Sequence, residues 1–239
     1  MNAGAAPGCG APEGGAPEGG ALEGGASEGG ASKGGAPEWL RNLAAAAATM
    51  DVPRYVRPPA SGGRPSAVLI LFGEGTEGPD LLYIQRSAGL RKHPGQPAFP
   101  GGSIDDGDDG PIAAALREAA EETGLDQSGV DVLSVLPELY ILRSGFRVTP
   151  VIAWWREPCE VRPVDTGEVA AVERIPLAAL ADPRYRFMLR GPSGHLGPAF
   201  SIGPMLIWGF TAVLTDRLLA LGGWERPWDA TVTRELPGA

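Results

Sequence analysis

A glycine-rich repeat restricts where this chain can fold. The first 38 of its 239 residues hold 13 of its 36 glycines, in a five-residue unit seen at 11–15 and 16–20. Glycine loses the most conformational entropy on ordering, and the stretch has almost no large apolar side chain to offset that loss. We predict a disordered tail over 1–38 and a single domain over 39–239. A role of the tail in partner binding or localisation stays open.

Composition excludes several classes of protein. The formal charge is −9 and no basic block is present, which argues against nucleic acid or an anionic membrane as a partner. Cys9 and Cys159 lie far apart, so we expect neither a disulfide scaffold nor a cysteine-based zinc site, and a cytoplasmic location suits the chain. The most apolar stretch, 205–221, contains Asp216 and Arg217. We therefore expect no membrane span, and the start of the chain does not resemble a signal peptide.

Apolar patterning predicts interleaved strands and helices. The run 67–72 has the length and composition of a strand, whereas 111–123 has helical periodicity. No regular strand–helix–strand rhythm is present, which favours a mixed-sheet α/β sandwich over a doubly wound sheet. The expected strands are 67–72, 81–86, 130–142, 146–155 and 168–175; the expected helices are 39–50, 111–123, 177–180 and 206–221; 73–79 and 87–110 are expected to be loops.

Gly73, Gly75 and Gly78 spell G-x-G-x-x-G directly after the first expected strand. A dinucleotide-binding turn needs a helix next, but 81–84 is typical of a strand. We therefore interpret these glycines as part of a hairpin loop.

One expected helix is well marked at both ends. Pro111 suits the first helical position, Asp109 or Gly110 can cap it, and Gly124 suits the left-handed residue that ends it. An apolar stripe is expected to face the core. The stripe consists of Ile112, Leu116, Ala119 and Ala120.

The same helix carries three carboxylates near its C-terminus. At about 100° per residue, Glu118, Glu121 and Glu122 fall within one third of the helix circumference. They repel one another, and the helix dipole favours cations at that end. Either water solvates this acidic face or a hard cation such as Mg²⁺ or Mn²⁺ neutralises it. More carboxylates precede the helix, at Asp105, Asp106, Asp108 and Asp109.

The segment 117–125 resembles the Nudix box, G-x5-E-x7-R-E-U-x-E-E-x-G-U, where U is apolar. It reads Arg-Glu-x-x-Glu-Glu-x-Gly-Leu and matches that part of the box in full. The front departs from the pattern, because 102–117 is one residue longer than the common form. Asp108 or Asp109 stands where the box has its first Glu, which leaves the role of that position open.

The preceding stretch is similar to the motif of the coenzyme A pyrophosphatase branch of that family. It reads Arg86-Ser87-x3-Arg91-x3-Gly95-x3-Phe99-Pro100-Gly101-Gly102. The motif's opening Leu-Leu-Thr is replaced by Leu-Tyr-Ile at 82–84, a partial departure. The segment 144–150 further resembles a core strand of the branch.

The resemblance implies an α/β/α sandwich with a mixed β-sheet and a divalent metal, Mg²⁺ or Mn²⁺. It makes Glu118, Glu121 and Glu122 the metal ligands. Arg117 would orient these carboxylates through paired hydrogen bonds, although a plain surface ion pair is the alternative. Gly101 and Gly102 would let the backbone pass close to metal and phosphates.

The resemblance also implies attack of water on a substituted diphosphate. We expect Glu121 to be the general base, with Glu168 as the second choice and Glu173 as a weaker one. Arg86 and Arg91 would bind substrate phosphates. We interpret His93 and His195 as loop residues bonded to backbone, and Trp208, Trp224 and Trp228 as packing residues.

The resemblance implies hydrolysis of coenzyme A or acyl-CoA to 4′-phosphopantetheine, or its acyl derivative, and adenosine 3′,5′-bisphosphate. Two alternatives stay open: a Nudix hydrolase for another substrate such as ADP-ribose, and a ligand-binding module that has lost catalysis. The partner is a small molecule, with no nucleic acid or membrane. The sequence leaves open whether the chain forms a homodimer.

Overall fold

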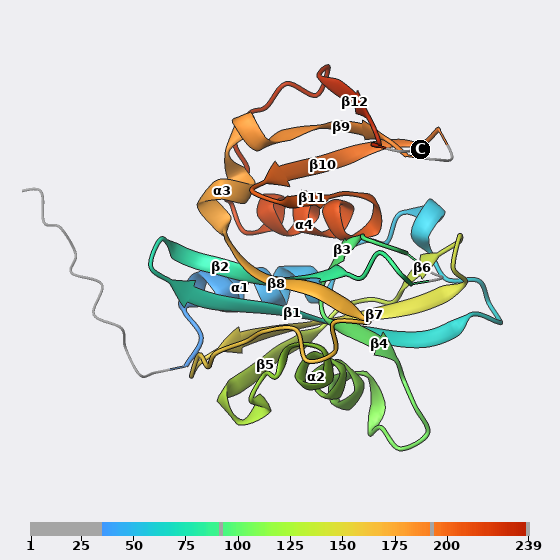
Figure 1. The fold of residues 1–239 in the computed structure, drawn as a ribbon, viewed down its shortest axis with the longest axis vertical. Helices are drawn as coiled ribbons and strands as arrows, with labels where there is room; N and C mark the ends of the chain where they lie inside the picture. The colour runs from blue at the N-terminus through green and yellow to red at the C-terminus, as the bar shows by residue number, and fades with distance from the viewer. Residues whose placement is uncertain (1–34, 91–92, 192–193, 238–239) are drawn as a thin grey trace, which may run out of the picture. The chain divides into compact units, whose positions relative to one another are not determined.

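The computed structural model describes residues 35–90, 93–191 and 194–237 (Figure 1). Most of the predicted tail, 1–34, lies outside these residues, so its disorder stays a prediction. Within the range assigned to the tail, Ala36 is already buried in the core and Glu38 begins the first helix. None of the described helices is long and apolar enough to cross a membrane.

Strands and helices follow one another without a regular repeat. The helices are α1 (Glu38–Ala48), α2 (Gly110–Thr123), α3 (Leu177–Ala181) and α4 (Gly209–Leu221), with 3-10 turns at Arg54–Val56, Gln127–Gly129 and Pro183–Tyr185. The main sheet contains β1 (Arg64–Gly75), β2 (Gly78–Arg86), β3 (Pro97–Ala98), β4 (Gly101–Ser103), β5 (Val130–Val135), β6 (Leu139–Ile141), β7 (Phe146–Trp155) and β8 (Val169–Pro176). A second sheet contains β9 (Arg186–Arg190), β10 (Leu196–Ile202), β11 (Met205–Ile207) and β12 (Thr233–Glu235).

The main sheet is mixed, as the sequence predicts. Its central strand β1 runs parallel to β7, with Leu69 opposite Val151. β2 and β4 pair with β1 in the antiparallel sense. The remaining strands extend these partners, also antiparallel: β3 and β8 pair with β2, and β5 and β6 pair with β7.

Helices cover both faces of the main sheet. Successive side chains of a strand point to opposite faces. Leu69 and Leu71 of β1 therefore pack toward α2, while Ile70 and Phe72 pack in the cluster that contains α1 and α4. Figure 1 shows α2 on one side of the sheet and α1 and α4 on the other. The apolar run of β1 is continuous because both faces of the strand are buried, and the predicted α/β/α sandwich is confirmed.

The second sheet was not expected from the sequence. The predicted helix 206–221 is wrong at its start, because Met205–Ile207 forms β11 and α4 begins at Gly209. A turn with Gly203 at φ 54° folds β11 back onto β10, pairing Met205 with Ile202. The prediction failed because a run of three apolar residues beside a helical segment is too short to show the periodicity that distinguishes a strand from a helix.

Two further boundaries differ from the prediction. The expected strand 130–142 is two strands, β5 and β6, separated around Pro137, which has no N–H to give to a sheet. The expected loop 87–110 contains the short strands β3 and β4, and β4 pairs with β1.

The G-x-G-x-x-G segment belongs to a β1–β2 hairpin, as predicted, but the expected loop 73–79 is wrong in its bounds, because Gly73 and Gly75 lie in β1 and Gly78 begins β2. A Cβ atom on Gly75 would lie 2.5 Å from Oδ2 of Asp80, so glycine leaves room for that buried carboxylate. Arg174 of β8 approaches the same Oδ2 to 2.8 Å, and its guanidinium lies 4.8 Å over the ring of Trp155. These glycines therefore accommodate an ion pair rather than a phosphate.

Arg174→Met should lower the free energy of unfolding by roughly 2–4 kcal/mol near neutral pH, because it leaves the Asp80 carboxylate buried without its cation. Burial already raises the pKa of Asp80, and Arg174 opposes that rise. Loss of Arg174 raises the pKa of Asp80 further. A raised carboxyl pKa lowers the free energy of unfolding only at pH values where the carboxyl group is ionised. The loss should therefore shrink as pH falls from about 7.5 to about 5.

Urea denaturation at the two pH values measures this effect. Arg162→Met, which removes an exposed arginine, is the matched control and should change the unfolding free energy little. An equal loss at both pH values for Arg174→Met would contradict the assignment of the cost to the charge of Asp80.

Candidate active site

α2 is held at both ends by backbone geometry. Gly124 adopts the left-handed conformation at φ 73° and donates its N–H to the Ala120 carbonyl, as predicted. Pro111 lies in the first turn. Asp109 occupies the N-cap position, one of the two options predicted, although its side chain makes no capping hydrogen bond.

The buried face of α2 is rotated from the expected stripe. The helix buries Ala114, Ala115 and Ala119, whereas Ile112 is exposed. Small side chains allow a helix backbone to approach a sheet closely. That approach carries Glu122 into the protein, where it is one of the few buried charged groups.

The three carboxylates of α2 differ in environment. The exposed fraction of the side chain is 61% for Glu121, 20% for Glu118 and 6% for Glu122. The expected acidic face is thus divided between solvent and the interior. Only the two inward carboxylates are positioned to neutralise a cation away from bulk water.

Glu122 is the least solvated of these groups. Its Oε2 accepts a hydrogen bond of 2.9 Å from the Gly101 N–H, and its Oε1 lies 3.8 Å from Nη1 of Arg86. Burial raises the pKa of Glu122 to about 7, against the opposing effects of Gly101 and Arg86, and the charges of Glu118 and Glu168 raise it further. The carboxylate is therefore poorly compensated by the protein itself.

Gly101 and Gly102 make room for this arrangement. A Cβ on Gly102 would lie 2.4 Å from Cδ of Glu118, and one on Gly101 would lie 2.2 Å from the Ala67 carbonyl oxygen. Gly101 also has φ 155°. Both positions therefore require glycine, because a side chain would separate β4 from β1 or displace Glu118. Burial is also the main cause of the raised pKa of Glu118.

Arg117 ties the loop before α2 to the carboxylates. Its Nε and Nη2 donate to the two oxygens of Asp108, each at 2.9 Å. Its Nη1 donates to Glu118 at 2.9 Å and to Glu121 at 3.0 Å. Hydrogen bonds from Arg117 lower the pKa of Asp108 to about 2. Asp108, rather than Asp109, is thus the loop carboxylate that engages the arginine of the box.

A hard cation suits this set of donors. Among the described residues, no three His, Cys, Asp or Glu side chains lie close enough to hold a metal ion together. The pair that faces inward, Glu118 and Glu122, nevertheless offers carboxylate oxygens, and burial raises the pKa of both groups. Within the part of the chain that the structure describes, Glu122 has no ion pair shorter than the 3.8 Å contact with Arg86. Carboxylate oxygens are the ligands that Mg²⁺ and Mn²⁺ prefer.

A pocket of about 660 Å³ opens beside these carboxylates. Among the residues that line it are several that the sequence singled out. They are Arg86, Gly101, Gly102, Glu118, Glu122 and Glu168, together with His93, His195, Phe99 and Trp208. Residues from β2, β4, α2 and the start of β8 thus converge on one cavity.

Other predicted residues lie elsewhere. Arg117 and Glu121 do not line the pocket, and Arg91 lies outside the described residues. Glu173 is in the middle of β8, paired with Tyr83. Of the three tryptophans expected to be packing residues, Trp224 and Trp228 pack against other side chains. Trp224 lies edge-on to Trp39, and Trp228 lies under the Arg186 guanidinium.

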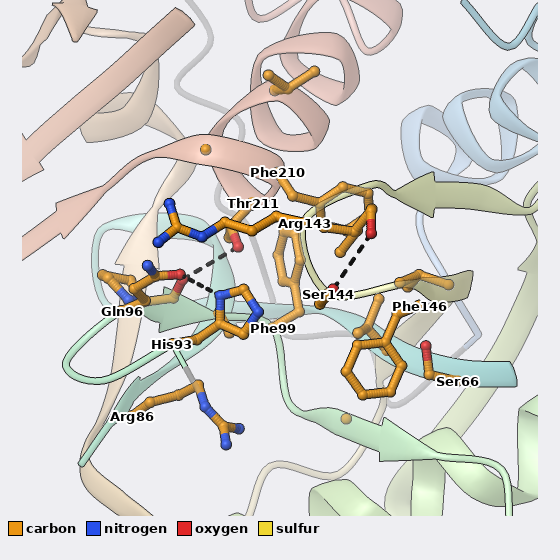
Figure 2. Close-up of a pocket in the computed structure, with 18 of the residues that line it drawn as sticks. Ser66, Arg86, His93, Gln96, Phe99, Arg143, Ser144, Phe146, Phe210 and Thr211 are labelled. Carbon is orange, nitrogen blue, oxygen red and sulfur yellow. Dashed lines mark hydrogen bonds between the residues drawn. The ribbon is translucent and has the colours of Figure 1, made fainter. Parts of the chain in front are cut away.

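One wall of the pocket was missed by the sequence analysis. It comes from the turn between β6 and β7, with Arg143 and Phe146, and from the start of α4, with Phe210 and Thr211. Figure 2 shows these side chains around the cavity, with Phe99 among them. Thr211 donates to the Pro97 carbonyl at 3.2 Å, which joins α4 to β3. Phe146 belongs to the segment 144–150 that resembles a core strand of the branch, but no sequence motif marks Arg143, Phe210 or Thr211.

Comparisons with known proteins relate the sequence of this chain to a family. The NUDIX domain profile matches residues 63–191. The uncharacterized Nudix hydrolase NudL of Escherichia coli strain K12 is 41% identical over 164 residues, which cover 66% of this chain and 83% of that protein. The protein of the same name from Shigella boydii serotype 4 is 42% identical over the same lengths. Among solved structures, a Nudix hydrolase from M. Smegmatis, RenU, is similar at 22% identity and TM-score 0.48, covering 71% of this chain and 91% of that one.

Gly102→Ala should lower the free energy of unfolding by about 1–3 kcal/mol, because the new methyl group overlaps the Glu118 carboxylate and forces it to move. Gly107→Ala is the matched control. A Cβ there meets nothing within 4 Å, so the change should stay within about 0.5 kcal/mol. Denaturant unfolding of both variants measures the difference. Equal stability of the two would show that the Gly102–Glu118 approach is not tight in solution.

Proposed function

The chain belongs to the Nudix hydrolase family, and from this premise we propose that it hydrolyses the diphosphate of coenzyme A or acyl-CoA with the help of a divalent cation. The products are 4′-phosphopantetheine, or its acyl derivative, and adenosine 3′,5′-bisphosphate. The supporting observation is that Arg86, from the coenzyme A motif, lines the same pocket as Glu118 and Glu122, from the Nudix box. A cation for phosphate and carboxylates for metal therefore face one cavity.

Glu118, Glu121 and Glu122 are the proposed ligands of Mg²⁺ or Mn²⁺. When bound, such an ion offsets the diphosphate charge, lowers the pKa of bound water and stabilises the departing phosphate. Two of the three proposed ligands, Glu118 and Glu122, already line the pocket, whereas Glu121 is held toward Arg117. Arg117 acts by fixing the carboxylates relative to the Asp108 loop.

The general base is a carboxylate that reaches the attacking water. Glu168 lines the pocket at the start of β8, and its backbone carbonyl accepts a hydrogen bond from Ser87 at 2.8 Å. Glu121 is largely exposed and does not line the pocket. This arrangement favours Glu168 as the base and leaves Glu121 with the metal.

Substrate phosphates are assigned to the arginines of the coenzyme A motif. Arg86 has a buried Nε without a hydrogen-bond partner among the described residues, and its Nη1 is 3.8 Å from Glu122. A buried N–H without a partner is costly, and a phosphate oxygen would satisfy it. The resemblance gives Arg91 the same role. The pocket volume falls in the range of sites for ligands larger than a bare diphosphate.

A product assay separates this function from its alternatives. The protein is incubated with coenzyme A, with ADP-ribose or with a dinucleotide, in Mg²⁺ or Mn²⁺ and in chelator. Metal-dependent release of 4′-phosphopantetheine, fastest from coenzyme A, supports the proposal. Faster cleavage of another substrate assigns the chain to a different Nudix activity. No cleavage of any of them favours a binding module that has lost catalysis. The cytoplasmic location and any homodimer remain predictions.

Glu122→Gln should reduce the metal-dependent rate at least about a hundredfold, because it removes a charge that the cation needs while keeping the side-chain shape. Glu121→Gln should have a similar effect. The thermal unfolding midpoint of Glu121→Gln should match that of the wild type, whereas that of Glu122→Gln should equal or exceed it, because the change removes a buried charge that the protein compensates poorly. Steady-state turnover and thermal unfolding measure the two effects. Unchanged rates would remove these residues from the mechanism.

Deletion of residues 1–34 should leave turnover on the same substrate nearly unchanged. The deleted sequence is dominated by Gly, Ala, Pro and Glu, which offer little for binding a diphosphate. The cut stops before Ala36, which packs in the core. The values of kcat and KM for the shortened and full chains test this prediction. A large loss of kcat on deletion would mean that the tail contributes to the site.

A further inference from the structure

His93 has an unusual backbone for a residue with a side chain. Its φ is +52°, and among the described residues it is the only non-glycine with a positive φ. Histidine tolerates this left-handed region better than most residues, but glycine adopts it with less strain. Such conformations persist where the surrounding structure holds them, and they gather at functional sites. The loop from β2 to β3 therefore holds His93 in place.

Several contacts brace this loop. The Gln96 N–H donates to the His93 carbonyl at 3.3 Å, and the Gly95 N–H donates to the Ser87 carbonyl at 3.3 Å. The side-chain amide of Gln85 donates to the Gly95 carbonyl. The ring of His93 is thus presented from a loop whose backbone is held by hydrogen bonds at Gly95 and Gln96.

The side chain of Gln96 also orients the His93 ring. Nδ1 of His93 lies 2.8 Å from Oε1 of Gln96. An amide oxygen only accepts, so Nδ1 carries the hydrogen and Nε2 is left to face another group. His93 and Gln96 both line the pocket, and Figure 2 shows the ring reaching into it beside Arg86 and Phe99. The expectation that His93 bonds to backbone is therefore wrong for its ring.

We propose that His93 is a further catalytic residue of this site, whose Nε2 protonates the oxygen that leaves during diphosphate cleavage. The inference rests on the proposed hydrolysis. The position favours it, because the ring enters the same cavity as Arg86, Glu118 and Glu122. The charged and titratable side chains that share the pocket with His93 are Arg86, Glu118, Glu122, Tyr140, Arg143, Glu168 and His195.

The step balances as a hydrolysis. The water oxygen bonds to one phosphorus, and the bond from that phosphorus to the bridging oxygen breaks, leaving its electron pair on the oxygen. That oxygen takes the Nε2 proton of the His93 imidazolium, while the water proton passes to a carboxylate of the site. His93 is left neutral, with its Nδ1 hydrogen still bonded to Gln96, and regains a proton from solvent.

His93→Gly tests the ring without straining the loop, since glycine adopts a positive φ freely. Using coenzyme A and Mg²⁺ or Mn²⁺, we expect kcat to fall about a hundredfold, the scale typical of a proton-transferring group. Added imidazole should restore the rate of this variant at least tenfold and should not stimulate the wild type. Its thermal midpoint should equal or exceed that of the wild type, because backbone strain is relieved.

His93→Asn is the matched control, because asparagine also tolerates this backbone conformation but carries no ring. It should be as slow as His93→Gly and less responsive to imidazole. Gln96→Ala should lower kcat less than His93→Gly or His93→Asn do, because it keeps the imidazole ring and removes only the contact that orients it. A purely structural role for His93 predicts no rescue by imidazole in any variant.

The outcomes separate this inference from the function it rests on. A wild type that cleaves coenzyme A, with a His93→Gly variant that is slow and rescued, supports both. A His93→Gly variant within twofold of the wild type overturns the role of His93 and leaves the proposed function intact. Loss of rate without rescue overturns proton donation. A wild type that does not cleave coenzyme A overturns the proposed function, and the His93 step falls with it.

Discussion

The burial of two carboxylates against two glycines organises this site. Glu122 accepts a hydrogen bond from Gly101, and Glu118 occupies the space that a side chain on Gly102 would fill. Carboxylates leave water only at a cost, and here the protein offsets that cost in part. α2 can approach the sheet because its inner face is largely alanine. What remains uncompensated is negative charge beside a cavity, which is the condition for holding a cation.

The cavity depends on segments that are remote in sequence. On one side, β4 of the main sheet supplies the glycines and α2 supplies the carboxylates Glu118 and Glu122. The second sheet and α4 close the other side, with Thr211 bonded to Pro97. The site is therefore lined by segments of both sheets, α2 and α4. The carboxylates on its inner side, Glu118 and Glu122, belong to the Nudix box, whereas its outer wall comes from other parts of the chain.

Much of the fold and part of the site could be predicted from the sequence, for identifiable reasons. The ends of α2 follow from Pro111 and Gly124, and the hairpin at Gly73–Gly78 follows from the strand that comes next. The burial order of Glu118, Glu121 and Glu122 could not be predicted, because it depends on how the helix rotates against β4. β9, β10 and β12 were missed because short strands carry little periodic signal. The ring contact of His93 with Gln96 required the fold of the loop.

The central claim is that the inward carboxylates of α2 hold a divalent cation at the pocket. Anomalous X-ray scattering from crystals soaked in Mn²⁺ tests it directly. We predict an anomalous peak within coordination distance of both Glu118 and Glu122, which disappears in crystals of Glu122→Gln. A peak only at the exposed Asp105–Asp106 segment, or none near α2, would contradict the account.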